Sequence, residues 1–342
     1  VRVNLMYHVH IKNNHHRIDT FPNTAQGEKV FTITRERFDT VASAHPEVAA
    51  QTKVSIDWDT DNFDHYMATA DVLVTWDLPT ENLAKVAPRL KWIHIIGAGV
   101  EHLTPIDWLP PGVTLTNNKG VHADKGGEFG IMSILMLHNH LPRIITHQNH
   151  ARYDSLYSTP IKGKTLVLIG TGSIGRAVAK HAQALGIHVI GVSRHGKPLP
   201  ELDEAVAVSE LDRVLPRGDF VFVVTPLTQE TTNLLSANRL ALMKPGAGLV
   251  NIGRAAVVDY DALGEGLNSG AIGGAVLDVF DPEPLPPESK FWSQPNLVIT
   301  PHVSADDGNA YVPLTLDVFF NNMRRLINGE ALENQVNTTL GY

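Results

Sequence analysis

The stretch Lys164–Arg176, which reads KTLVLIGTGSIGR, predicts the fold of the larger part of the chain. It opens with a short apolar run, Leu166–Ile169, of the kind that forms a strand buried on both faces. Gly170-x-Gly172-x-x-Gly175 follows directly, and an apolar helical pattern comes next. In this context the glycines indicate dinucleotide binding, because they permit a tight turn and let the backbone and the helix N-terminus approach a pyrophosphate. A glycine turn without a ligand is the alternative, and the strand–turn–helix context disfavours it.

Composition narrows the classes of protein that the chain can belong to. Its 342 residues suit two domains, and 43% hydrophobic with 19% charged residues is typical of a globular protein. The formal net charge of −8 argues against nucleic acid or an anionic membrane as a partner. The absence of cysteine excludes disulfides and thiolate sites. We expect a cytoplasmic location, since we find no signal-peptide pattern and no apolar run long enough to span a membrane. The 17 histidines predict no metal site, because they lack cysteine or paired carboxylates nearby.

The first part of the chain alternates strand and helix patterns, which predicts a small open α/β domain. Expected strands lie at 1–9, 53–58, 71–76, 92–96 and 113–116, with helices at 34–44 and 83–90. Gly97-Ala98-Gly99-Val100 follows the fourth of these strands, where a glycine loop either binds an anion or is a plain turn.

A helical pattern then runs from Asp124 to about residue 150, with Asp124 as the expected N-cap and a break at Pro142. Its apolar residues are assigned to the core or to a subunit interface: Phe129, Ile131, Met132, Leu135 and Met136.

The second part continues from the glycine motif as βαβ units, which predicts a doubly wound parallel sheet. The strand expected at 187–192 ends in Ser193 and Arg194, where an acid that binds the ribose 2′-OH of NAD would commonly stand. A hydroxyl followed by a guanidinium suits a 2′-phosphate, so we predict a preference for NADP(H), with NAD(H) possible. The alternative is that Arg194 is a solvated loop residue.

Three groups able to carry chemistry lie at or beyond strand ends of this second part: Arg254, Glu283 and His302. Parallel strands end on one edge of the sheet, so these side chains should face the crevice next to the glycine loop. Each alone is explained by an ion pair, a solvated loop or a buried histidine. Together they suit hydride chemistry on a 2-keto acid, with a guanidinium for the carboxylate and a histidine–carboxylate pair as proton donor.

Several ordered motifs resemble the D-isomer-specific 2-hydroxyacid dehydrogenase family over nearly the whole chain. GTGSIGR resembles its nucleotide loop, NIGRAAVVDYDAL its arginine block, GAVLDVFDPEPLP its acidic block and NLVITPHVS its histidine block, while GAGVEHL and TNNKGVHADKGGEF resemble signatures of its first domain. The resemblance implies a Rossmann-type nucleotide domain at 123–304 and a smaller flavodoxin-like substrate domain formed by 1–122 and 305–342. It also implies a homodimer built around the helix that follows Asp124.

The resemblance implies roles by position. Arg254 would bind the substrate carboxylate and polarise the carbonyl, His302 would be the acid/base group and Glu283 its partner. The backbone amides of Ala98, Gly99 and Val100 would take the substrate carboxylate. Asp278 would hold the nicotinamide carboxamide. The remaining coenzyme contacts are assigned to the glycine loop and to strand ends: Gly170, Gly172, Ser173, Ile174, Gly175, Ser193, Arg194, Thr225, Pro226 and Ile252.

The expected activity is therefore reversible NAD(P)H-dependent reduction of a small 2-keto acid to a D-2-hydroxy acid. A dinucleotide-sensing corepressor or scaffold of the same family remains an alternative, as does a formate or phosphite dehydrogenase, although Glu283 speaks against formate. Trp76, Trp292 and Tyr311 either line the substrate pocket or serve ordinary packing. Ser304-Ala305-Asp306-Asp307 departs from the small residues common in the family and leaves that rim of the pocket open. The identity of the keto acid is likewise left open.

Overall fold

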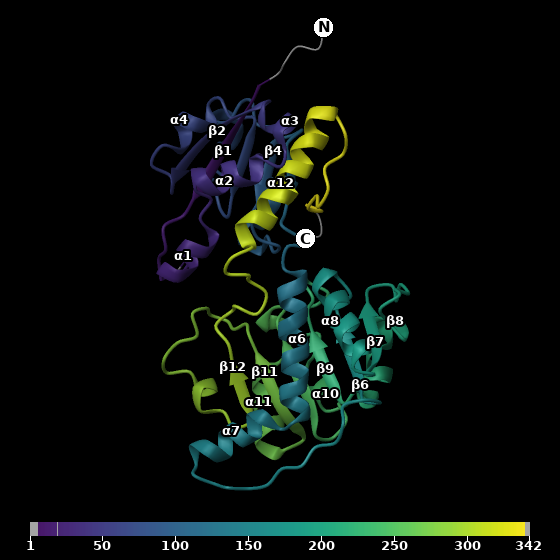
Figure 1. The fold of residues 1–342 in the computed structure, drawn as a ribbon. Helices are drawn as coiled ribbons and strands as arrows, with labels where there is room; N and C mark the ends of the chain where they lie inside the picture. Colours follow the sequence, from purple (N-terminus) through teal and green to yellow (C-terminus); the bar gives the residue numbers. More distant parts are fainter. Residues whose placement is uncertain (1–5, 19, 339–342) are drawn as a thin grey trace. The chain divides into compact units, whose positions relative to one another are not determined.

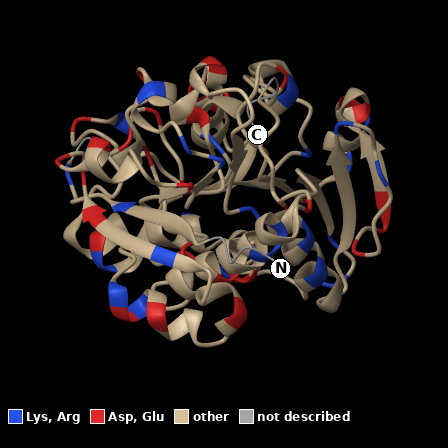
Figure 2. Cartoon of the chain, turned by 90° about the horizontal axis from the view of Figure 1, so that it is seen from above, with Lys and Arg blue, Asp and Glu red and all other residues tan. Residues whose placement is uncertain are grey.

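The computed structural model describes residues 6–18 and 20–338, which form two compact units. Unit 1 comprises Val1–Val121 and Asp307–Tyr342, and unit 2 comprises His122–Asp306. Figure 1 shows that each unit is built on its own sheet with helices on both faces. Acidic and basic residues are interspersed along the ribbon in Figure 2, in keeping with the mixed composition. Within the described residues, no helix is both long and apolar enough to cross a membrane.

Unit 1 contains a five-stranded sheet in the order β2-β1-β3-β4-β5, with every pair parallel. This is the flavodoxin-like order, as predicted. Its strands are β1 (Tyr7–Asn13), β2 (Thr52–Trp58), β3 (Val72–Thr75), β4 (Trp92–Ile95) and β5 (Thr114–Thr116). The strand expected at 1–9 in fact begins at Tyr7 and runs on to Asn13, and residues 1–5 lie outside the described part of the chain.

Both faces of this sheet are buried, so alternate residues of one strand enter different cores. Val72 and Val74 pack with helices α2 and α12, whereas Leu73 packs on the opposite face with α4 and α5. The C-terminal helix α12 (Tyr311–Asn328) contacts α2 (Arg35–Ala42) of this same unit. The helices of unit 1 are α1 (Ala25–Phe31), α2 (Arg35–Ala42), α3 (Pro46–Ala49), α4 (Phe63–Met67), α5 (Leu83–Val86) and α12 (Tyr311–Asn328), with short 3₁₀ turns η1 (Glu101–Leu103) and η2 (Ile106–Trp108).

Unit 2 contains a seven-stranded parallel sheet in the order β12-β11-β10-β9-β6-β7-β8. Numbered from β6, this is the Rossmann order 3-2-1-4-5-6 with one further strand, as predicted. The strands are β6 (Thr165–Ile169), β7 (His188–Ser193), β8 (Glu204–Ala207), β9 (Phe220–Val223), β10 (Ala247–Asn251), β11 (Ile272–Leu277) and β12 (Leu297–Ile299). The sequence did not reveal β8, because Glu204-Ala205-Val206-Ala207 carries a single large apolar residue that is buried.

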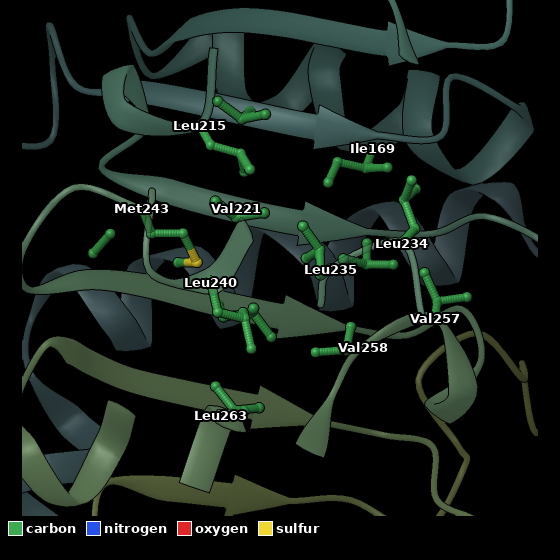
Figure 3. Close-up of a cluster of buried hydrophobic side chains, with 14 of the residues drawn as sticks. Ile169, Leu215, Val221, Leu234, Leu235, Leu240, Met243, Val257, Val258 and Leu263 are labelled. Atoms are coloured by element: carbon green, nitrogen blue, oxygen red, sulfur yellow. The ribbon is translucent and has the colours of Figure 1, made fainter. Parts of the chain in front are cut away.

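Helices cover both faces of this second sheet. Figure 3 shows one of the two cores, where Val221 and Ile169 of the sheet meet Leu240 and Leu263 of the covering helices. The helices of unit 2 are α6 (Ala123–His138), α7 (Leu141–Asn149), α8 (Ser173–Ala184), α9 (Leu211–Val214), α10 (Ala237–Leu240) and α11 (Tyr260–Ser269), with 3₁₀ turns η3 (Val208–Glu210), η4 (Leu215–Arg217), η5 (Ala255–Val257) and η6 (Lys290–Ser293).

The helical stretch after residue 122 breaks before Pro142, as predicted, and gives α6 and α7. The expected N-cap at Asp124 is wrong: His122 precedes the helix, and Asp124 lies in its first turn, where a carboxylate still favours the positive end of the helix dipole. The side that meets α8 is made by glycines. A Cβ on Gly127 would lie 2.7 Å from Ala177 Cβ, and one on Gly130 would lie 2.4 Å from Val178 Cγ2.

The expected apolar face of α6 is consequently divided between core and surface. Phe129 is buried, but Met132 is 45% exposed and Leu135 is 36% exposed. Core contacts come instead from the glycines and from residues such as Ile134, which is fully buried. The exposed residues leave the predicted subunit interface open, and because glycine has no side chain to signal burial, the apolar residues alone did not indicate the side of α6 that contacts α8.

Candidate functional site

The glycine loop joins β6 to α8 and is fixed by close backbone contacts. Gly170 adopts φ +108°, and a Cβ there would lie 2.7 Å from the Val224 carbonyl oxygen. A Cβ on Gly175 would lie 2.0 Å from the Gly170 carbonyl oxygen, so both positions require glycine. Gly172 differs, because a Cβ there would meet no heavy atom within 4 Å. The open space beside Gly172 and the N-terminal amides of α8, at Ser173 and Ile174, fit a bound pyrophosphate.

A second feature that fits a dinucleotide is the edge of the sheet beside this loop. Thr225 follows β9, and its Oγ1 is buried without a hydrogen-bond partner among the described residues. Buried hydroxyls are usually paired, so an unpaired one at a strand end indicates a ligand contact. A Cβ on Gly253 would lie 2.8 Å from the Thr225 carbonyl oxygen, which brings the loops after β9 and β10 together. Ile252 is buried beside them, and Pro226 is exposed.

The predicted 2′-phosphate residues lie at the end of β7. Ser193 is half-buried at the last position of the strand. The Arg194 guanidinium is held by a carboxylate, with Nη2 2.7 Å and Nε 2.9 Å from Glu230 Oε2. A phosphate and this carboxylate are both acceptors for the same guanidinium, so the Glu230 contact competes with the predicted role.

His302 follows β12, Glu283 follows β11, and their side chains form a close pair. His302 Nδ1 lies 2.7 Å from Glu283 Oε2, and the Phe280 backbone N–H donates to Glu283 Oε1 at 2.7 Å. Burial opposes the charged carboxylate, but the hydrogen bond and charge of His302, the Phe280 amide and the charge of Arg254 outweigh it, so the pKa of Glu283 lies below its ordinary value. Burial likewise opposes the imidazolium, yet Glu283 outweighs it and the pKa of His302 is raised. The pair therefore favours a protonated histidine beside an ionised carboxylate.

The His302 backbone is held in a left-handed conformation, with φ +53°. Such a conformation is rare for a residue other than glycine and persists where surrounding contacts enforce it. Asp278 supplies those contacts: its carbonyl oxygen accepts from His302 N at 2.9 Å, and its carboxylate accepts from Thr300 Oγ1 at 2.6 Å, Val303 N at 3.0 Å and Ser304 N at 3.1 Å. Asp278 is fully buried, and burial raises the pKa of its carboxyl group.

Arg254 belongs to the same edge of the sheet, in the loop after β10. Its Nη1 donates to the Gly253 carbonyl at 2.8 Å, and its charge acts on both His302 and Glu283. Asn251, which is fully buried, shapes this loop because its Oδ1 accepts from Gly253 N and its Nδ2 donates to the Arg254 carbonyl, each at 3.0 Å. The sequence prediction had not included Asn251, although a polar residue ending an otherwise apolar strand was a usable signal.

In unit 1 the loop predicted to bind the substrate carboxylate, Ala98–Val100, follows β4, and we call it the carboxylate loop. The amides of Ala98, Gly99 and Val100 donate to no acceptor in the described part of the chain. The loop is braced from behind, since Asn117 Nδ2 donates to the Ala98 carbonyl at 2.7 Å. Consecutive unengaged amides at a strand end are suited to an anion such as a carboxylate.

Trp76, Trp292 and Tyr311, which the sequence assigned either to the substrate pocket or to ordinary packing, have different surroundings. The Trp76 ring covers the carboxylate loop so closely that a Cβ on Gly97 would lie 2.2 Å from it, and it stacks on His102 at 4.1 Å. Tyr311 is buried in unit 1, and its hydroxyl donates to the Ile96 carbonyl at 2.6 Å. Trp292 is in unit 2, is 54% exposed and donates to the Pro286 carbonyl.

No group of three or more His, Asp or Glu side chains within residues 6–18 and 20–338 could hold a metal ion. A Rossmann sheet, a glycine loop open to a pyrophosphate and a histidine–carboxylate pair at the same strand ends define a dinucleotide-dependent oxidoreductase.

Comparison with known proteins identifies the family. Residues 131–304 match the family model described as D-isomer specific 2-hydroxyacid dehydrogenase, NAD binding domain. The chain is 32% identical to a glyoxylate reductase of Thermococcus litoralis over 281 residues, or 78% of this chain and 83% of that protein. It is also 32% identical to a hydroxypyruvate reductase of Thermotoga maritima over 235 residues, or 68% and 76% of the two chains.

Solved structures of similar proteins superpose on this chain over nearly its full length. A D-isomer specific 2-hydroxyacid dehydrogenase from Xanthobacter autotrophicus Py2, in complex with NADPH and MES, superposes with a TM-score of 0.80 at 27% identity over 99% of this chain and 100% of that one. An NADPH-dependent glyoxylate/hydroxypyruvate reductase from Sinorhizobium meliloti, in complex with NADP and sulfate, gives 0.78 at 25% identity over 98% and 99%. The chain belongs to the D-isomer specific 2-hydroxyacid dehydrogenase family, and it is an NAD(P)-dependent 2-hydroxyacid dehydrogenase.

Proposed function

We propose that the chain reduces a small 2-keto acid to the D-2-hydroxy acid, reversibly, with His302 as the acid/base group. The observation that carries this proposal is the 2.7 Å contact between His302 Nδ1 and Glu283 Oε2 on a loop anchored by Asp278. With Nδ1–H donated to the carboxylate, Nε2 is the nitrogen that remains for the substrate. The pair with Glu283 raises the pKa of His302 and so favours the imidazole with a proton on Nε2, from which it can be delivered to the carbonyl oxygen.

Arg254 serves as the cation that binds the substrate carboxylate and polarises the carbonyl. A guanidinium suits both tasks, because its fixed fork of donors remains charged at any pH of interest. The amides of Ala98, Gly99 and Val100 provide the second set of donors for the carboxylate.

The coenzyme, when bound, supplies the hydride in reduction. Gly172, Ser173 and Ile174 hold its pyrophosphate, and Thr225, Pro226, Ile252 and Asp278 contact the remainder. Three of the roughly four acceptor positions of the Asp278 carboxylate are used by the loop at 300–304, so one remains for a carboxamide N–H.

We also propose that NADPH is preferred over NADH, through Ser193 and Arg194. Support comes from the absence of an acid at the end of β7 and from the NADPH and NADP bound in the Xanthobacter and Sinorhizobium structures. Arg194→Ala should lower kcat/KM for NADPH while leaving kcat/KM for NADH nearly unchanged. Glu230→Gln should raise affinity for NADPH, because it removes the competing carboxylate. A wild-type preference for NADH would refute this coenzyme proposal.

For the substrate we propose glyoxylate or hydroxypyruvate, which the similar reductases are named for. Trp76 packs against the carboxylate loop, since a Cβ on Gly97 would lie 2.2 Å from its ring, and a bulky ring on this side of the loop favours a small keto acid.

A homodimer is the assembly we propose. Large apolar side chains are exposed along the outer side of α6, on α7 and in the segment that follows: Met132, Leu135, Leu141, Ile144, Tyr153 and Tyr157. A run of exposed apolar residues of this kind marks a protein–protein contact, and a second copy fits the family resemblance. Leu135→Glu should convert the dimer to a monomer in light scattering.

The decisive experiment for the activity is steady-state kinetics of His302→Ala with glyoxylate, hydroxypyruvate, pyruvate and an aromatic keto acid, using both coenzymes. We expect wild-type turnover of glyoxylate and hydroxypyruvate and a loss of about a thousandfold in the variant, within the range of general acid–base catalysis. Activity of His302→Ala within a few-fold of wild type would refute the acid/base assignment. A wild-type protein that binds coenzyme but turns over no keto acid would point to the sensing or scaffold alternative.

A further inference from the structure

Tyr260, the first residue of α11, points back from its helix toward the carboxyl ends of β10 and β11. Its hydroxyl donates to the Val279 carbonyl at 2.8 Å and accepts from Asn251 Nδ2 at 3.0 Å. Its ring packs edge-on against Phe280 at 6.0 Å and Phe291 at 5.7 Å. The hydroxyl therefore connects the strand end that leads to Arg254 with the loop that carries Glu283.

The Val279 carbonyl belongs to the peptide unit whose other end holds Glu283. A peptide unit is planar, so the carbonyl of Val279 and the N–H of Phe280 turn together. Tyr260 fixes the carbonyl end, and the Phe280 N–H donates to Glu283 Oε1 at 2.7 Å. The other oxygen of Glu283, Oε2, contacts His302 Nδ1. Only one peptide plane and one carboxylate separate the tyrosine hydroxyl from the imidazole.

We propose that Tyr260 is a positioning residue for the Glu283–His302 pair: its hydroxyl fixes the 279–280 peptide unit and so fixes the orientation of the Glu283 carboxylate. This inference rests on the acid/base roles proposed above for His302 and Glu283. It adds a residue outside the predicted site, from the N-terminus of a helix, that acts on the proton donor through backbone.

Two physical effects operate along this path. A hydrogen bond to the Val279 oxygen polarises the amide, which strengthens the bond that the Phe280 N–H donates to the carboxylate. It also prevents the peptide from tilting, which would carry the carboxylate away from His302. Besides Glu283, the charged groups that face His302 are Arg254 and Asp278, and loss of the tyrosine hydroxyl leaves both in place. A weaker Glu283 contact then lowers the pKa of His302 toward its ordinary value.

A competing route would run through Asn251. One hydrogen of Asn251 Nδ2 goes to the Tyr260 hydroxyl and the other to the Arg254 carbonyl, each at 3.0 Å. If Tyr260 acted by this route, its loss would disturb the guanidinium that binds the substrate carboxylate, and KM for the keto acid would change rather than the pH dependence.

The test is Tyr260→Phe, which removes the hydroxyl and retains the ring contacts, so the variant should fold. Reduction needs protonated His302, and kcat/KM for the keto acid therefore falls as pH rises through the pKa of that group. We expect kcat to fall about three- to tenfold, as for loss of one neutral hydrogen bond. The high-pH limb should move to lower pH, and KM for the coenzyme should stay unchanged. Ser133→Ala is the matched control, because its buried hydroxyl bonds to the Phe129 carbonyl within α6. It should lower thermal stability without moving the limb.

A double-mutant cycle with Glu283→Gln identifies the path. If Tyr260 acts through Glu283, adding Tyr260→Phe to Glu283→Gln should change kcat by less than twofold and leave the high-pH limb of the profile where it is in Glu283→Gln. The reason is that the shared path is already broken in the single variant. Additive losses would overturn the proposal. So would a Tyr260→Phe variant with wild-type kcat and pH profile but lower thermal stability, or one in which only KM for the keto acid changes. The basis of the inference is tested separately, since full activity in His302→Ala would refute the proposed acid/base role whatever Tyr260→Phe shows.

Discussion

The Glu283→Gln variant gives the most direct access to the proposed proton donor. The substitution keeps the shape of the side chain, so the Phe280 N–H and His302 Nδ1 retain a polar neighbour. What is lost is the negative charge that raises the pKa of His302. A hydrogen bond to a charged group contributes about 1.5–3 kcal/mol, which corresponds to roughly 10- to 150-fold in rate. His302 is 48% exposed, so screening by solvent places the expected loss toward the lower end, at about 10- to 30-fold.

The loss should depend on pH in a defined direction. With its pKa lowered, His302 loses its proton at a lower pH, so the variant falls furthest behind wild type above neutrality and approaches it in acid. The assay is initial-rate reduction of glyoxylate from pH 5.5 to 9.5, followed through NADPH absorbance. A pH-independent loss would mean that Glu283 only orients the ring. If Glu283→Gln kept the high-pH limb of its profile in the wild-type position and had wild-type kcat, the proposed effect of Glu283 on His302 would be refuted.

Three further predictions follow from the same contacts. Gly172→Ala should fold like wild type and weaken coenzyme binding in calorimetry, because its Cβ would enter the open space proposed for the pyrophosphate. Gly175→Ala should instead lower the melting temperature, since its Cβ would lie 2.0 Å from a carbonyl oxygen. Asp278→Asn should lower the free energy of unfolding in urea by about 1–3 kcal/mol, because an amide cannot accept every bond that the loop donates to the carboxylate. The pair of Glu283 and His302 should stabilise the fold most between about pH 4.3 and 6.5. The histidine contribution is complete below the unfolded pKa of about 6.5 and is lost as pH rises through its raised folded value. The glutamate contribution is present above the unfolded pKa of about 4.3 and is lost as pH falls through its lowered folded value. The contribution of the pair is measured by comparing the melting temperatures of a Glu283→Gln, His302→Asn double variant and of wild type across this pH range.

The sequence was sufficient for those parts of the fold in which local pattern and tertiary burial agree. The apolar run at 166–169 was correctly predicted to be a strand, because both faces of a parallel sheet are buried and the pattern needs no partner to be recognised. The expectation failed where a side chain carried no signal. The core face of α6 is made by glycines that let α8 approach, and β8 contributes one large buried apolar residue.

Within the candidate site, the sequence predicted the functional groups and the pairing of His302 with Glu283, but not the contacts that hold this pair in place. His302 and Glu283 were expected to interact because their motifs resemble those of the family, and the contact itself depends on the loop that Asp278 anchors. Asn251 was missed although its place at the end of an apolar strand was a usable signal, whereas Tyr260 gave no such signal. A tyrosine at the start of an amphipathic helix is usually explained by packing, and only coordinates show its hydroxyl on the carbonyl of another loop.

The left-handed backbone at His302 explains why one buried carboxylate has so many partners. A histidine with φ +53° would relax to an ordinary conformation if the loop at 300–304 were free, and that relaxation would turn the imidazole away from Glu283. Asp278 prevents this relaxation: its carboxylate accepts hydrogen bonds from the backbone N–H groups of Val303 and Ser304, and its carbonyl oxygen accepts one from the backbone N–H of His302. Because the imidazole is fixed from the Asp278 side and the carboxylate from the Tyr260 side, neither partner depends on the other for its orientation. Loss of Glu283 should therefore change the protonation of His302 without releasing its loop, and this is why the loss of activity in Glu283→Gln is expected to depend on pH.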